Sequence, residues 1–253
     1  MSPPLGIELA GGILTATLAR PEKKNALNAA MIEGLHDAID RTDQDPAVRV
    51  LVIAGAGDDF CAGADLTELL ASADKSPAEN ERDALRLGEV FVRLRALPRP
   101  VVAVVRGRAL AGGAGLASAC DIVIASDQAT FGYPEIQRGF VPAMVMTMLR
   151  RLAGEKATFD LVATGRLMGA AEAQRVGLVT RVVPDAALAA EAKALCSQLI
   201  QQSATAFALT KQLFYELDGQ QFEEGIRLGA RINALARTTP DFHASIAQFL
   251  QQK

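Results

Sequence analysis

The sequence predicts a layered α/β fold that continues into a helical C-terminal region. Two short apolar runs, Ile7–Leu9 and Ile13–Leu18, flank Gly11-Gly12, which is the pattern of a β-hairpin. Nearly continuous apolar runs follow at 48–54, 101–105 and 122–125, as expected for strands buried on both faces. Because loops and helical segments separate these strands, the alternation favours parallel pairing.

Between the strands, polar and glycine-rich segments mark the expected loops and helix ends. Asn28 is a suitable N-cap for a helix with apolar residues at Met31, Leu35 and Ile39. A glycine-rich loop is expected over 55–63, then a polar segment over 72–82 and a helix that ends before Pro98. A second glycine-rich turn, over 107–115, leads into a short helix.

From Pro142 onward the predicted elements are mostly helical. The expected helices are 143–152, 155–163, 170–176, 185–201, 205–217, 222–235 and 242–250, with one short strand at 179–183. We therefore expect a core over residues 1–197 and a helical region over 198–253. Apolar stripes on the last three helices fit core packing or a shared subunit interface equally well, because amphipathic faces look alike in both cases.

Composition excludes several classes of function. The chain has 253 residues, 50 % of them hydrophobic, and a net charge of −3, so the basic stripe of a nucleic-acid-binding protein is missing. No secretion signal and no apolar run long enough to cross a bilayer are recognised. Three cysteines without close pairing favour a reducing, cytoplasmic setting. With only His36 and His243, both on expected amphipathic helices, a histidine-rich metal site is excluded.

Two glycine-rich segments are suited to binding an anion. Ala111–Gly115 and Gly63-Ala64 both lie at expected helix starts, where small residues allow backbone N–H groups to approach a ligand. A helix N-terminus also carries partial positive charge. Two such donors that converge on one oxygen form an oxyanion hole. Close packing of a helix on a strand would require the same small residues.

A third segment, Phe131–Pro142, contributes a carboxylate. Glu135 stands between Pro134 and Ile136 in otherwise apolar sequence. A carboxyl group desolvated by such neighbours has a raised pKa and exchanges protons near neutral pH. An exposed turn glutamate is the alternative interpretation.

Together these segments resemble the crotonase family, also called the enoyl-CoA hydratase/isomerase family. The resemblance runs along nearly the whole chain and rests on four motifs in order: Arg20–Asn28, Phe60–Leu66, Gly107–Asp121 and Phe131–Ile136. The stretches 161–165 and 170–178 also resemble the family's pattern. The implied fold is a spiral of ββα units with a C-terminal helical region that builds trimers, often stacked as hexamers.

The resemblance also implies roles for individual residues. Ala64 and Gly112 match the two oxyanion donors, and Glu135 matches the family's acid/base. Lys24 and Ala26 match the loop near the adenine and phosphate end of CoA, and Ala62, Asp65 and Leu66 match positions along it. Coenzyme A is part of the acyl-CoA substrate, so no separate cofactor and no metal are expected.

Two positions depart from the family pattern. Gly115 stands where hydratases commonly carry a second glutamate, so water activation would depend on Glu135 alone. At the C-terminus, Lys253 is the residue nearest to the family's CoA-phosphate lysine. The stretches 112–116 and 131–143 also resemble a subgroup of hydratases for branched glutaconyl-type CoA esters. Arg138 could pair with the second carboxylate of such a substrate; a solvated surface arginine is the alternative.

The favoured function is therefore hydration of a 2-enoyl-CoA thioester, with Tyr133, Phe140, Met144 and Met146 as candidates for an apolar acyl chamber. One alternative is a Δ3,Δ2-enoyl-CoA isomerase that uses Glu135 as its sole proton shuttle. An alternative of another class is a CoA-thioester- or RNA-binding protein with little activity, which the acidic net charge disfavours.

Overall fold

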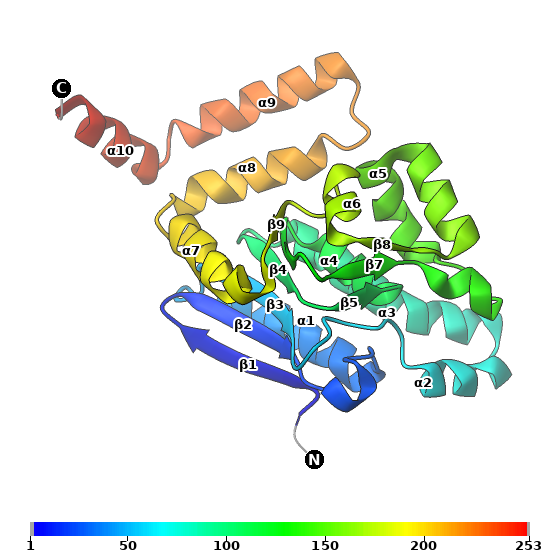
Figure 1. Ribbon diagram of the computed structural model, residues 1–253. Coiled ribbons are helices and arrows are strands. Elements are labelled where there is room, and N and C mark those ends of the chain that lie inside the picture. The colour runs from blue at the N-terminus through cyan, green and yellow to red at the C-terminus, as the bar shows by residue number, and fades with distance from the viewer. Residues whose placement is uncertain (1–2, 252–253) are drawn as a thin grey trace.

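A six-stranded sheet lies at the centre of the fold (Figure 1). The structure is a computed structural model and describes residues 3–251. The strand order is β1 (Leu5–Ala10), β2 (Ile13–Leu18), β3 (Val50–Gly55), β4 (Val101–Val105), β6 (Ile122–Ser126), β9 (Arg181–Val183). β1 and β2 pair antiparallel and every later pair is parallel, so the predicted hairpin and parallel sheet are confirmed.

Both faces of this sheet are covered, and side chains alternate between them. Leu51 and Ile53 of β3 belong to the larger core, which includes residues of α1 (Ala29–Gln44) and α3 (Pro77–Ala96). Val50 and Val52 pack in a second cluster against α7 (Leu188–Ile200). Because successive residues of a strand point to opposite faces, a strand covered on both sides must be apolar throughout.

Local capping explains where the helices begin. Asn28 Oδ1 accepts a hydrogen bond from Met31 N at 2.9 Å, which confirms the predicted N-cap of α1. α3 begins earlier than predicted, inside the segment that the sequence indicated only as polar. Ser76 and Glu79 form a reciprocal capping box there, and Pro77 occupies the first turn, so polar residues start this helix instead of preceding it.

A second, smaller sheet was not predicted. It consists of β5 (Arg108–Leu110), β7 (Thr130–Gly132) and β8 (Leu167–Gly169), in that order. β5 lies inside the segment that the sequence indicated only as a glycine-rich turn, and α4 (Gly112–Ala119) follows it. Strands of three residues are too short to show an alternating pattern, so periodicity misses them.

The remaining helices of the core connect the strands of the two sheets. α5 (Ala143–Thr164) joins the two helices predicted for 143–163, with a non-helical Gly154 between them at φ 74° and ψ 175°. α6 (Ala170–Arg175) comes next, and α2 (Leu66–Ala71) lies earlier in the chain. The short 3₁₀ helices are η1 (Pro21–Lys23), η2 (Ser72–Asp74), η3 (Pro134–Arg138) and η4 (Asp185–Ala187).

The C-terminal region consists of α8 (Ala204–Glu216), α9 (Phe222–Ala236) and α10 (Pro240–Gln251). Figure 1 shows α9 and α10, in orange and red, standing apart from the body of the molecule. Neither helix buries a residue in the described chain. The expected boundary at 197/198 falls within α7, which packs on the sheet and ends at Ile200. Over residues 3–251, no helix is long and apolar enough to cross a membrane.

One buried ion pair attaches α8 to the core. Lys211 Nζ lies 2.7 Å from Asp121 Oδ2 and donates to the carbonyl oxygens of Leu94 at 2.8 Å and Arg99 at 3.1 Å. Tyr215 Oη donates to the other oxygen of Asp121 at 2.9 Å. These contacts give Asp121, the residue before β6, a structural role, and they satisfy every donor of the buried ammonium.

Candidate active site

The N-terminus of α4 presents unpaired backbone donors. Ala111, just before the helix, has φ 51° and ψ −124°, a conformation that is strained for a residue with a side chain. Its N–H donates to Gly132 O at 2.8 Å and its carbonyl accepts from Gly115 N at 3.0 Å. Within residues 3–251, Gly112 N, the first N–H of the helix, has no acceptor.

A second segment runs parallel to β5 and ends beside this turn. Cys61 pairs with Ala109 in an isolated parallel bridge. The Arg108 guanidinium donates two hydrogen bonds to the Asp59 carboxylate, from Nε to Oδ1 and from Nη2 to Oδ2, each of 2.7 Å. Ala64 follows Cys61 by three residues, as Gly112 follows Ala109. Since paired parallel strands advance together, this register brings residues 64 and 112 to the same edge.

Close packing confirms that the two turns meet. A Cβ on Gly63 would lie 2.8 Å from Ala111 Cβ and 3.6 Å from Gly112 N. Ala64 forms a bridge with Leu27 in which Gly63 O and Asp65 N make the hydrogen bonds. Ala64 N itself has no acceptor in the part of the chain that the structure describes. The two free N–H groups and the helix dipole suit an anionic oxygen.

Glu135 follows β7, the strand whose Gly132 O accepts the hydrogen bond from Ala111 N. β7 pairs with β5 through Leu110 and Gly132, and the chain then enters η3, where Pro134 and Glu135 form the first turn. The Glu135 side chain is buried, and its Oε2 atom has no hydrogen-bond partner among the described residues. Burial raises the pKa of Glu135, while a backbone hydrogen bond and the positive charge of Arg138 lower it in part.

Tyr133, an expected acyl-pocket residue, is fully buried two positions before Glu135. Burial raises the pKa of its phenol, contact with the Ser118 hydroxyl lowers it, and the charge of Glu135 raises it. Its Oη atom is the second site atom without a hydrogen-bond partner in residues 3–251.

The position of Gly115 is filled by neighbours. A Cβ on Gly115 would lie 2.4 Å from Val145 Cγ1 of α5 and 3.1 Å from Phe91 Cζ of α3. Both distances are shorter than ordinary van der Waals contact. The backbone therefore has no room for a second carboxylate at this position as long as Val145 keeps its place.

The residues expected at CoA come together at one loop pair. Ala62 N donates to Lys24 O at 3.0 Å, and Leu27 N donates to Gly63 O at 2.8 Å. This places Lys24 and Ala26 beside Ala62, nearly forty positions away in sequence. Lys24 is exposed, so its ammonium group is available to a phosphate.

Asn25 organises this loop, and the sequence motif did not assign it a role. It is fully buried, with φ 54°. Its amide donates to Ala56 O at 2.9 Å and Asp59 O at 2.7 Å, and its Oδ1 accepts from Arg20 N at 3.0 Å. A short amide side chain tolerates the left-handed backbone and satisfies three backbone groups at once.

Asp65 and Leu66 have different environments. Arg20 Nη2 binds Asp65 Oδ2 at 2.8 Å, and Thr67 N donates to Oδ1 at 2.9 Å. The hydrogen bond from Arg20 contributes most to lowering the pKa of Asp65. The carboxylate therefore holds the loop and caps α2. Leu66, which follows it, is 56 % exposed and free to contact a ligand.

The remaining predicted residues lie around η3 and α5. Arg138 is exposed, and its one hydrogen bond within the described chain is a 3.5 Å contact to Pro134 O. Phe140 is also exposed, at 46 %. Met144 and Met146 pack on the core partly buried. Lys253 lies outside the described residues.

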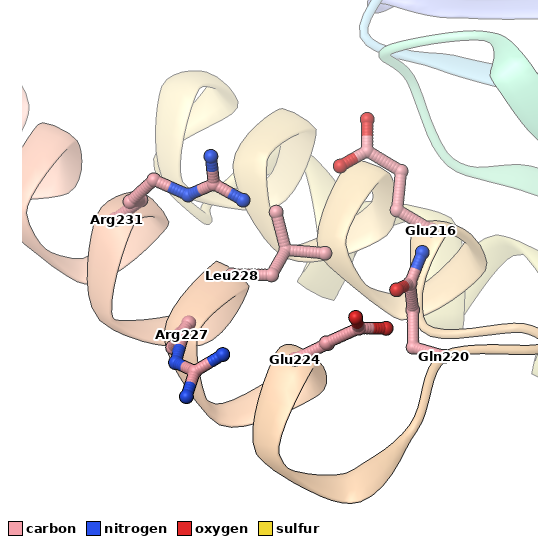
Figure 2. A pocket seen from close by; sticks show the side chains of 6 residues that line it. All are labelled: Glu216, Gln220, Glu224, Arg227, Leu228 and Arg231. Atoms are coloured by element: carbon pink, nitrogen blue, oxygen red, sulfur yellow. The ribbon is translucent and has the colours of Figure 1, made fainter.

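A cavity of about 430 Å³ lies elsewhere, between α8 and α9 (Figure 2). It is lined by Glu216, Gln220, Glu224, Arg227, Leu228 and Arg231. No residue of the site described above contributes to it. Its lining is mostly charged, and Figure 2 shows that Glu216 comes from α8, Gln220 from the connecting loop and the other four residues from α9.

Comparison with known proteins gives consistent matches over the full chain. The model of the family described as enoyl-CoA hydratase/isomerase matches residues 8–253. A Thermus thermophilus protein carrying an enoyl-CoA hydratase name is 42 % identical over 96 % of both chains. The 2,3-dehydroadipyl-CoA hydratase of Escherichia coli is 34 % identical over 95 % of this chain and 93 % of its own. The crystal structure of an enoyl-CoA hydratase from Mycobacterium smegmatis superimposes with a TM-score of 0.95 at 33 % identity, covering 100 % of this chain and 98 % of that one.

Proposed function

Because the chain belongs to the enoyl-CoA hydratase/isomerase family, we propose that it adds water to a 2-enoyl-CoA thioester. The observation that carries this proposal is the buried, unpartnered Oε2 of Glu135 beside two free backbone donors, Ala64 N and Gly112 N. Enolate chemistry requires a carboxyl group that transfers protons and an oxyanion hole that stabilises the carbonyl oxygen.

In the proposed reaction, Ala64 N and Gly112 N donate hydrogen bonds to the thioester carbonyl oxygen. Glu135 takes a proton from water while the water oxygen bonds to C3, and the electron pair of the double bond moves toward the carbonyl oxygen. The enolate then collapses as Glu135 returns the proton to C2. One carboxyl group serves both transfers, so no second acid is required.

Coenzyme A enters as part of the substrate. In this proposal the exposed Lys24 faces its phosphates, and Ala26, Ala62 and Leu66 line its path. Asp65 supports that path indirectly, because its carboxylate is engaged by Arg20. No separate cofactor takes part.

For the acyl group we propose a branched or glutaconyl-type chain. Arg138 supports this, because it is exposed near Glu135 and has no carboxylate partner in the described chain. The name of the Escherichia coli relative, a 2,3-dehydroadipyl-CoA hydratase, also denotes an acyl chain with a terminal carboxylate.

Isomerisation is the second candidate, and the occlusion at Gly115 favours it. An enzyme with one carboxylate can move a proton from C2 of a 3-enoyl-CoA to C4 without any water. Glu135 would remove the C2 proton and deliver it to C4, while Ala64 N and Gly112 N hold the carbonyl oxygen of the intermediate dienolate.

We also propose that the chain assembles as a trimer or hexamer. α9 and α10 expose large apolar side chains, including Phe222 at 83 %, Ile226 at 61 % and Leu235 at 52 %. Faces of this kind on a free monomer are typical of subunit contacts. Sedimentation analysis tests this, and a monomer at micromolar concentration would contradict it.

The deciding experiment incubates the protein with crotonyl-CoA, 3-methylglutaconyl-CoA and a 3-enoyl-CoA, with Glu135→Gln as the control. Mass spectrometry should show a gain of one water that is lost in the variant. Conversion of the 3-enoyl substrate to its 2-enoyl isomer, without any water gain, would establish isomerisation instead. Activity that persists in Glu135→Gln would contradict both candidates.

A further inference from the structure

Two buried polar atoms in the site have no hydrogen-bond partner. Of the buried side-chain atoms in residues 3–251, only Tyr133 Oη, Glu135 Oε2 and Thr158 Oγ1 are unpartnered. Tyr133 and Glu135 are separated in sequence by Pro134 alone. Buried polar groups in folded proteins are almost always hydrogen-bonded, so two such atoms on residues 133 and 135 indicate a small polar occupant.

The hydrogen-bond capacity of the two groups limits what that occupant is. Ser118 Oγ donates its proton to Ala114 O at 2.7 Å, and within residues 3–251 no hydrogen bond joins Ser118 to Tyr133 Oη. The phenol O–H of Tyr133 is therefore free to donate to a bound molecule, whereas an ionised Glu135 Oε2 only accepts.

We propose that Tyr133 Oη and Glu135 Oε2 together hold the water molecule that adds to the substrate. A water that accepts a hydrogen bond from the Tyr133 hydroxyl and donates a proton to Glu135 Oε2 keeps its second oxygen lone pair free for C3. That is the orientation a nucleophilic water requires. The inference rests on the proposed hydration and assigns Tyr133 as a water-binding group of the site.

The assignment supplies what the chain lacks at Gly115. Val145 and Phe91 occupy the space around that position, so no carboxylate there can orient water. In the hydration step the water oxygen bonds to C3 and its proton passes to Glu135, which later delivers a proton to C2. Tyr133 keeps its proton throughout and only orients the water.

Tyr133→Phe tests the proposal because it removes one oxygen and preserves the ring. Hydration kcat should fall about 10- to 100-fold, since one water-positioning contact is lost. Exchange of the C2 hydrogens of butyryl-CoA in D2O needs Glu135 and the oxyanion hole but no added water. It should stay within about twofold of wild type, whereas Glu135→Gln should lose both reactions.

The chain's only other tyrosine is a matched control. Tyr215→Phe also removes a phenol oxygen, but one that bonds Asp121 away from the site, and it should leave hydration unchanged. If Tyr133→Phe lowers hydration and exchange equally, or lowers neither, the water-binding role is overturned. If it does not fold, the crystal structure of the wild-type protein provides the second test.

A crystal structure of the wild-type protein separates this proposal from the proposed function. An ordered water within hydrogen-bond distance of both atoms, absent from Tyr133→Phe crystals, supports the assignment. A wild-type site without that water overturns it, whatever the reaction. A wild type that holds the water and exchanges C2 hydrogens but never hydrates any enoyl-CoA would leave the water site standing and refute hydration.

Discussion

Replacing Gly115 by alanine should destabilise the protein even though alanine is the better helix former. Gly115 lies within α4, where alanine alone contributes about 1 kcal/mol over glycine. The new methyl would lie 2.4 Å from Val145 Cγ1 and 3.1 Å from Phe91 Cζ. Overpacking of this kind costs about 1–3 kcal/mol, and Val145 cannot easily rotate away because its side chain branches at Cβ.

The contact is severe enough to place the overpacking cost at the upper end of that range. The net expectation is a loss of about 1–2 kcal/mol, obtained by setting overpacking against helix propensity. For a chain of this size the melting temperature should fall by roughly 2–8 °C. Thermal unfolding followed by circular dichroism at one fixed protein concentration measures it, since assembly also affects the melting temperature.

The double variant Gly115→Ala/Val145→Ala makes the test specific. Val145→Ala alone should cost about 2 kcal/mol through lost burial and a residual cavity. In the double variant the new methyl occupies part of that cavity. The double variant should therefore lose about 1–3 kcal/mol less stability than the sum of the two single variants. A Gly115→Ala protein that melts at or above wild type, or strictly additive losses, would refute the packing argument.

Three further outcomes follow from the structure. Activity should be lost as pH falls through the raised pKa of Glu135, because the base must be ionised. Arg138→Leu removes a positive charge that lowers this pKa. In that variant the loss of activity should therefore occur at higher pH in a kcat/KM profile. An unmoved profile would contradict that coupling. Asn25→Ala should cost about 2–4 kcal/mol, since three backbone groups lose their partner, and urea unfolding would show it. Lys211→Met should cost about 3–5 kcal/mol because it leaves Asp121 buried without its cation; combining it with Asp121→Asn should restore part of the stability.

Local pattern was enough to predict most elements. The hairpin around Gly11-Gly12, the buried strands and the cap at Asn28 depend on residues close in sequence. The start of α3 was missed because its capping residues are as polar as a loop. The small sheet was missed because three-residue strands carry no periodic signal.

By itself the sequence determined the fold class and the family motifs, because these depend on residue identity and short-range order. Only the tertiary structure decided how the motifs meet. The parallel register of Cys61 with Ala109 leads Ala64 N and Gly112 N toward one edge. Val145, thirty positions after Gly115 in sequence, fills the space of a second carboxylate. Strand register and side-chain volume depend on partners distant in sequence, so no local pattern could have predicted either.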